Sequence, residues 1–148
     1  MTPRKVTIAA LFALTVSLGL TIAAQQRRSL SYEPAVVELQ GRLTIELKYG
    51  PPNYGEQPRT DAKLKVPVLR LHEPIDIRGN PEDTLNAESV EGVKELQLIF
   101  KSGTAYKQLI SKRVLVKGTL FRGHSGHHFT DVVMNVSSIE VKKKDRTQ

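Results

Sequence analysis

Three of the four histidines in the chain, His124, His127 and His128, lie within five residues of one another. Imidazole nitrogens are common ligands of Zn²⁺ and other divalent transition metals, and Asp131 could add an oxygen ligand. The segment lacks the helix and the catalytic glutamate of the best-known zinc motif. Histidines in a hairpin also serve as turn and edge residues that donate hydrogen bonds to nearby carbonyls. Both a metal site and a purely structural role therefore remain open.

A second group of candidate residues lies in the segment 49–60, where six positions are glycine, proline or asparagine. That density of turn formers predicts a long loop. Asn53, Tyr54 and Glu56 are candidate binding residues there, because an exposed tyrosine ring can stack on a ligand. Tyrosine can also anchor a loop on the core, and Glu56 and Asp61 are the pattern expected of loop acids that cap backbone amides.

Nothing in the chain forms a recognisable catalytic set. Ser125 lacks the G-x-S-x-G spacing of a strand-to-helix nucleophile elbow, and no glycine-rich phosphate-binding loop is present. The absence of cysteine excludes disulfides, thiolate metal sites and cysteine nucleophiles. These observations favour a protein that is not an enzyme.

The elements that must position these residues are strands. Apolar and polar residues alternate with period two, and the inward set of the first strand includes Ile45, Leu47 and Tyr49. Gly41 and Gly118 take inward positions, which is typical of strands that bend sharply. The alternation predicts five strands, over residues 37–49, 63–71, 93–100, 113–122 and 130–141, with Ile75 and Ile77 extending the second beyond Pro74.

Residues 106–110 carry apolar side chains at helical spacing, which predicts one short helix between the third and fourth strands. This order predicts an all-β fold, a five-stranded OB-fold-like Greek-key barrel whose loops bind ligands. We expect the barrel over residues 35–141, after a linker at 25–34 and before a basic tail at 142–148. The length of 148 residues allows only this one core.

The N-terminal segment 1–24 has the pattern of an export signal. Arg4 and Lys5 precede an uncharged run that ends in Ala23 and Ala24, as a signal peptidase requires. The run is also close to the length that spans a bilayer, and positive charge directly after the cut opposes translocation. An anchor in the inner membrane facing the periplasm is therefore the alternative to a cleaved, periplasmic or secreted protein, and contact with a membrane is expected only in that case.

The formal net charge of +7 raises the question of a nucleic-acid partner. Single-strand binders need aromatic platforms among basic residues, and only 5% of this chain is aromatic. Export argues further against nucleic acid. The C-terminal basic run has the composition of a solvated tail, with contact to a polyanion as the alternative.

Several short motifs resemble one protein family. They are the GPPNYGE loop at 50–56, Pro74-Ile75 at a strand end, GTLF at 118–121 and GHHFT at 126–130. Over roughly 36–139 the chain resembles the bacterial domain-of-unknown-function family 4431. The chain has Ser125 where the family often has threonine, and Phe129 where it often has a further histidine, which weakens a metal site inferred from the family. The resemblance implies an exported bacterial protein without an established activity.

Two hypotheses of function follow from the residues. The first is a non-enzymatic periplasmic binding or inhibitor module that recognises an envelope protein or a small ligand through Asn53, Tyr54, Glu56, His124, His127, His128 and Thr130. The alternative is a metal-binding protein or metal-dependent hydrolase that holds Zn²⁺ or another divalent transition metal with His124, His127, His128 and Asp131. A stress protein of the cell envelope that acts through its positive charge is a third, weaker hypothesis.

Overall fold

A computed structural model describes residues 27–142 of the chain. The predicted signal segment and most of the basic tail lie outside these residues. Within them, no helix is both long and apolar enough to cross a membrane. The elements are β1 (Arg28–Ser31), β2 (Val36–Tyr49), β3 (Lys63–Arg78), β4 (Val90–Phe100), the single 3-10 turn η1 (Lys107–Leu109), β5 (Arg113–Arg122) and β6 (Val132–Val141).

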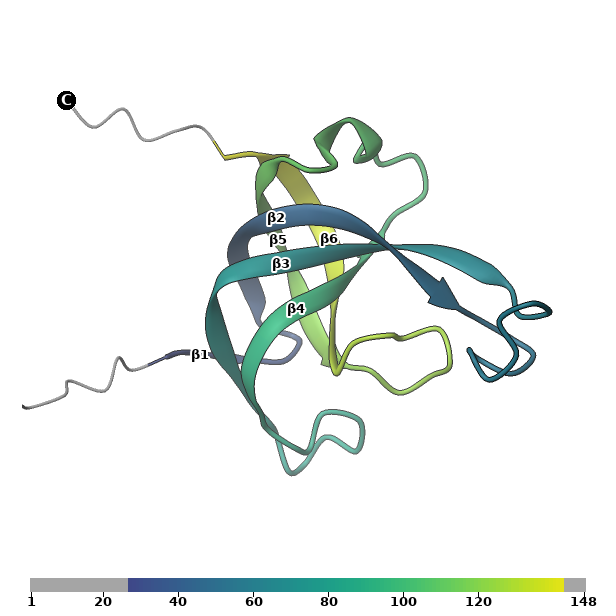
Figure 1. Ribbon diagram of the computed structural model, residues 1–148. Coiled ribbons are helices and arrows are strands. Elements are labelled where there is room, and N and C mark those ends of the chain that lie inside the picture. The colour runs from purple at the N-terminus through teal and green to yellow at the C-terminus, as the bar shows by residue number, and fades with distance from the viewer. Residues whose placement is uncertain (1–26, 143–148) are drawn as a thin grey trace, which may run out of the picture.

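Five of these strands close into a ring (Figure 1). β2 pairs with β3 on one edge and with β5 on the other, β5 pairs with β6, β6 runs parallel to β4, and β4 returns to β3. This is the strand order of the OB-fold, with the loop containing η1 between its third and fourth strands. The predicted all-β, OB-fold-like class is confirmed, and the predicted short helix is a single 3-10 turn.

The fold begins further toward the N-terminus than expected. Four residues of the predicted linker form β1, which pairs in parallel with Ile75–Arg78 of β3. β3 thus pairs first with β2 and then with β1 along the same edge, and a cavity of about 530 Å³ lies where it passes from one to the other. Tyr32, just after β1, is 3% exposed and belongs to the core.

Gly41 lies where β2 is paired on both edges, with Leu71 of β3 and Val114 of β5. A Cβ atom at this position would lie on the carbonyl oxygen of Arg70. The strand can therefore coil tightly only because residue 41 has no side chain, as the glycine at an inward position predicts.

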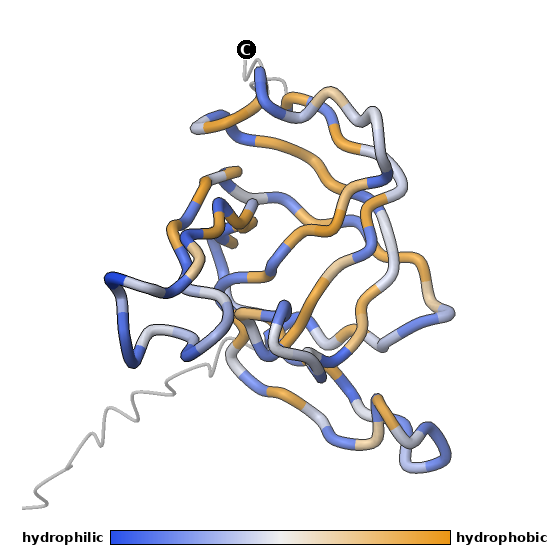
Figure 2. The backbone as a smooth tube through the Cα atoms, turned by 90° about the vertical axis from the view of Figure 1, so that its right-hand side faces the viewer, coloured by the Kyte–Doolittle hydropathy of each residue, from blue (hydrophilic) through white to orange (hydrophobic). Residues whose placement is uncertain are grey.

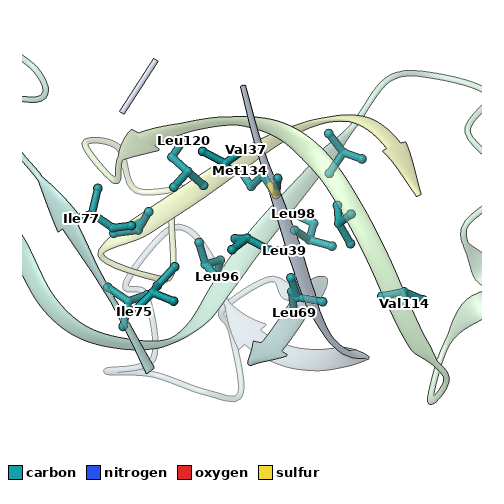
Figure 3. Packing of buried hydrophobic residues seen from close by; sticks show 14 of the residues in the cluster. Val37, Leu39, Leu69, Ile75, Ile77, Leu96, Leu98, Val114, Leu120 and Met134 are labelled. Carbon is teal, nitrogen blue, oxygen red and sulfur yellow. The ribbon is translucent and has the colours of Figure 1, made fainter. Parts of the chain in front are cut away.

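The core consists of the inward faces of the ring (Figure 3). Apolar residues follow the strands while the projecting loops are mainly hydrophilic (Figure 2). The labelled side chains in Figure 3 converge from all five strands of the barrel: Val37, Leu39, Leu69, Ile75, Ile77, Leu96, Leu98, Val114, Leu120 and Met134.

The sequence alternation predicts buried side chains along the whole of β2, but the barrel includes only the first part of this strand. β5 pairs with β2 only as far as Arg42, after which β2 and β3 continue as a two-stranded projection, here called the arm (residues 44–49 and 63–67). Ile45 and Tyr49 are consequently only partly buried, and Leu47 is 54% exposed. The expectation that these three residues lie in the core is therefore wrong.

Candidate functional site

The connection between β5 and β6, residues 123–131, folds back over the outside of the barrel. Strand registers place Val68, Gln97, Val133 and Phe121 in one row across β3, β4, β6 and β5. Because cross-strand partners share a face, these four side chains all point outward. Each is nevertheless at most 8% exposed. The outer face is therefore covered at this row, and the hairpin at 123–131 contributes the cover.

Gln97 holds the hairpin in place with both ends of its side chain. Its Nε2 donates to the carbonyl oxygen of His127 at 2.9 Å, and its Oε1 accepts from the N–H of Phe129 at 2.7 Å. The N–H of Gln97 also donates to Thr130 Oγ1 at 2.9 Å, and that hydroxyl donates to the carbonyl of Val132. The hairpin is thus fixed by hydrogen bonds to a buried amide, with Thr130 as part of the clamp.

The rings of two candidate histidines, His124 and His128, lie against Phe121 in tilted and edge-on orientations. The ring of His128 lies edge-on to Phe121 and to His124, with centroid separations of 5.2 and 4.8 Å. His128 Nδ1 accepts the N–H of His124 at 3.1 Å, which places the proton of the neutral ring on Nε2. His124 Nδ1 lies 2.9 Å from the carbonyl oxygen of Arg122, so it carries a proton and donates. Both Nδ1 atoms are used within the hairpin.

This use of the imidazoles bears on metal binding. Among residues 27–142, no group of three or more histidine, cysteine, aspartate or glutamate side chains is arranged to hold a metal ion. His127 is exposed and contributes its carbonyl to Gln97, while Asp131 is exposed and accepts the N–H of Gly123 through its backbone. The metal site made of His124, His127, His128 and Asp131 stays a prediction without geometric support.

The loop 50–62 is organised by Asp61, which is only 6% exposed. Its carboxylate accepts the N–H groups of Asn53, Gly55 and Gln57 at 2.8 to 3.2 Å, and also the side-chain amide of Asn53. Burial acts to raise the pKa of Asp61, but the hydrogen bonds from Gly55, Asn53 and Gln57 outweigh it and lower the pKa. The capping of amides expected of Asp61 is therefore present, and the side chain of Asn53 takes part in holding the loop.

Tyr54 joins the loop to the hairpin. Its backbone has a φ of 50°, in the left-handed region, and its side chain is 51% exposed. A Cβ atom on Gly126 would lie 2.8 Å from the Tyr54 hydroxyl and 2.9 Å from the adjoining ring carbon, so the ring sits directly against this glycine. Figure 1 shows the two loops on the same side of the barrel. We name the surface formed by residues 50–56 and 123–130 the two-loop surface.

The structure therefore brings together two segments that are separated in sequence by residues 57–122 and that were expected to act as one surface. Tyr54, Glu56, His124 and His127 are exposed on it, whereas Asn53, His128 and Thr130 are partly buried and make hydrogen bonds within it. Sequence reasoning missed Gln97. It alternates with Leu96 and Leu98, so it has the pattern of an ordinary outward-facing strand residue.

His128 should make the hairpin sensitive to acid. Burial, and then the neighbouring His124 and His127, lower the pKa of His128 below 6.5. A lowered folded-state pKa means that the unfolded chain binds the proton first, so stability is complete above about pH 6.5 and is lost as the pH falls through the folded-state pKa. Protonation of Nδ1 would also remove the acceptor for the His124 N–H.

We expect His128→Asn to remove this part of the pH dependence, measured by urea denaturation at about pH 7.5 and about pH 5.5. His72→Asn is the matched control, since His72 is exposed on β3. A His128→Asn protein that loses as much stability in acid as the wild type would contradict the assignment.

Comparison with known families addresses the resemblance directly. Residues 95–140 match the model of the family named Domain of unknown function (DUF4431). The suspected resemblance is thereby confirmed over this part of the chain. The DUF4431 match includes Gln97 and the whole hairpin, and it excludes the loop 50–62. Comparison with curated proteins gives no match.

Proposed function

We propose that the protein is an exported, non-enzymatic binding module that recognises an envelope protein through the two-loop surface. The observation that carries this proposal is the packing of Tyr54 against Gly126, which makes one continuous surface of the two loops. Export rests on the sequence pattern of residues 1–24.

The proposed binding role is supported by the fact that both loops are held in a fixed conformation before any partner docks. Each loop is held by one buried polar side chain, Asp61 in one and Gln97 under the other. Burying polar groups is unfavourable unless each is hydrogen-bonded, and here both side chains are hydrogen-bonded to backbone groups of the loop they hold. Loops that are rigid before binding lose less conformational entropy when a partner docks.

A protein partner suits the shape and chemistry of the surface. Its exposed side chains include one tyrosine and two histidines on projecting loops, and tyrosine is enriched at protein interfaces. The two larger of the cavities described, about 630 and 530 Å³, contain no residue of the two loops, and only the smallest one, about 250 Å³, includes Phe129 and Thr130.

The test is site-specific photo-crosslinking in cells, with the reactive residue placed at position 127 and, as a control, at Gln108 in η1. We expect a discrete adduct from position 127 and none from position 108. Tyr54→Asn should abolish the adduct, because asparagine tolerates the left-handed backbone while removing the ring. Gly126→Ala should weaken it by displacing that ring.

Two outcomes would refute the proposal. One is the same adduct at positions 127 and 108, which would indicate non-specific proximity. The other is an adduct that survives both Tyr54→Asn and Gly126→Ala in proteins that remain folded by circular dichroism.

A further inference from the structure

The arm leaves one edge of β2 without a partner strand. Leu43 is the last residue of β2 bonded on the β5 side: its N–H donates to the carbonyl of Lys112, and its carbonyl accepts the N–H of Ser111. Backbone groups alternate in direction along a strand, so the N–H and C=O groups of Ile45, Leu47 and Tyr49 point to this same side. Within residues 27–142, no hydrogen bond between backbone groups occupies them.

The other edge of the arm is protected. β3 pairs with β4 only from Val68 onward, and the residue just before it is Pro67. Pro67 lies opposite Ile45, so its nitrogen faces away from β2, toward the open edge of β3. Proline has no N–H to donate, and placing it on an edge is a common way of preventing strand addition. The β2 edge has no such block.

The free β2 edge is complementary to itself. In an antiparallel pair of two copies, the register that places Leu47 opposite Leu47 also places Glu46 opposite Lys48 and Ile45 opposite Tyr49. A shift of one residue in each strand sets Glu46 against Glu46, or Lys48 against Lys48, which is unfavourable. In the first register, Leu47, Ile45 and Tyr49 also have outward-directed N–H and C=O groups, as the hydrogen-bonded positions of an antiparallel pair require.

We infer that two copies of this chain associate through antiparallel pairing of the β2 edges in their arms, in the register Leu47 to Leu47. The dimer has two-fold symmetry, because the same edge serves on both copies. It joins the two arms into one sheet and covers Leu47, which is 54% exposed in the single chain. Lys48, 2.9 Å from Glu46 of its own strand, gains the Glu46 of the second copy as a further partner.

Only six residues of each strand take part, so the contact is smaller than a permanent interface. We therefore expect a monomer and dimer in exchange, with the dimer fraction rising with concentration. Sedimentation equilibrium of the purified protein should show the mass shifting toward twice that of the monomer. A protein that stays monomeric up to about 1 mM would overturn the inference.

Charge exchange tests the register. Lys48→Glu places two carboxylates opposite each other in the homodimer, and Glu46→Lys places two ammonium groups opposite each other. Each variant alone should be monomeric. Mixed in equal amounts, they should form a heterodimer, because every opposing pair is again of unlike charge. Rescue on mixing cannot result from a folding defect, although Glu46→Lys also removes the ion pair with Arg70.

Lys65→Glu is the matched control, since Lys65 is exposed on the protected strand of the same arm. It should leave the dimer intact. Dimers of Lys48→Glu as abundant as those of the wild type, or no heterodimer in the mixture, would refute this register and with it the inference.

Discussion

Replacing Gly118 by alanine is expected to lower the free energy of unfolding by about 3 kcal/mol or more, the upper range for overpacking a core position. A Cβ atom there would lie on the carbonyl oxygen of Asn135, 2.9 Å from its carbonyl carbon and 3.1 Å from the Cα of Val136. All three atoms belong to the backbone of β6, so no side-chain rotation can relieve the contact.

Gly118 also lies where the pairing of β5 with β6 is irregular. The register between β5 and β6 shifts between Lys117 and Gly118, which lets β5 turn around the barrel. Urea denaturation measures the effect, with Lys117→Ala as the control because Lys117 is exposed on the same strand. If Gly118→Ala were as stable as Lys117→Ala, the close approach of β5 and β6 would be wrong.

The second large effect is expected from Gln97→Leu. Leucine has a similar volume but cannot bond to Phe129 or His127, so the hairpin's Phe129 N–H and His127 carbonyl lose their partly buried hydrogen-bond partners. A fully buried unsatisfied group costs about 1–3 kcal/mol, and because these two groups are only partly buried the expected loss of stability is about 2–4 kcal/mol in total.

Hydrogen exchange separates a local from a general effect in this variant. The amide of Phe129 should exchange much faster than in the wild type, whereas amides of the β2–β5 ladder should change less. Gln40→Leu is the control, since Gln40 is an exposed glutamine on β2. A slowly exchanging Phe129 amide in Gln97→Leu would show that another group holds the hairpin.

The strands were predictable because each leaves a local pattern. The fourth strand was predicted at its observed limits of Arg113–Arg122, since Val114, Val116 and Leu120 fall at even spacing on one face. The arm was not predicted, because Leu47 has the same alternation whether or not a barrel continues beneath it. β1 was missed because four residues carry too little periodicity to distinguish a strand from a linker.

The two segments of the two-loop surface were predicted from the sequence. The two residues that hold these segments in place, Asp61 and Gln97, were only partly predicted. Turn formers mark the loop at 50–60, and three histidines mark the hairpin. Gln97 could not be found, since its burial depends on a hairpin that begins 26 residues later. Asp61 was expected to cap amides, but its four hydrogen bonds depend on how the loop closes, which is a property of tertiary structure.

The position of β1 also bears on the predicted cleavage of the N-terminal segment. The predicted cleavage point follows Ala24, and β1 begins four residues later at Arg28. In the folded domain Ser29, Leu30 and Ser31 are held along Asp76, Ile77 and Arg78. If the chain is cleaved after Ala24, as we expect, only residues 25–27 would separate the new N-terminus from β1, and the mature protein would begin almost directly with a strand of the sheet.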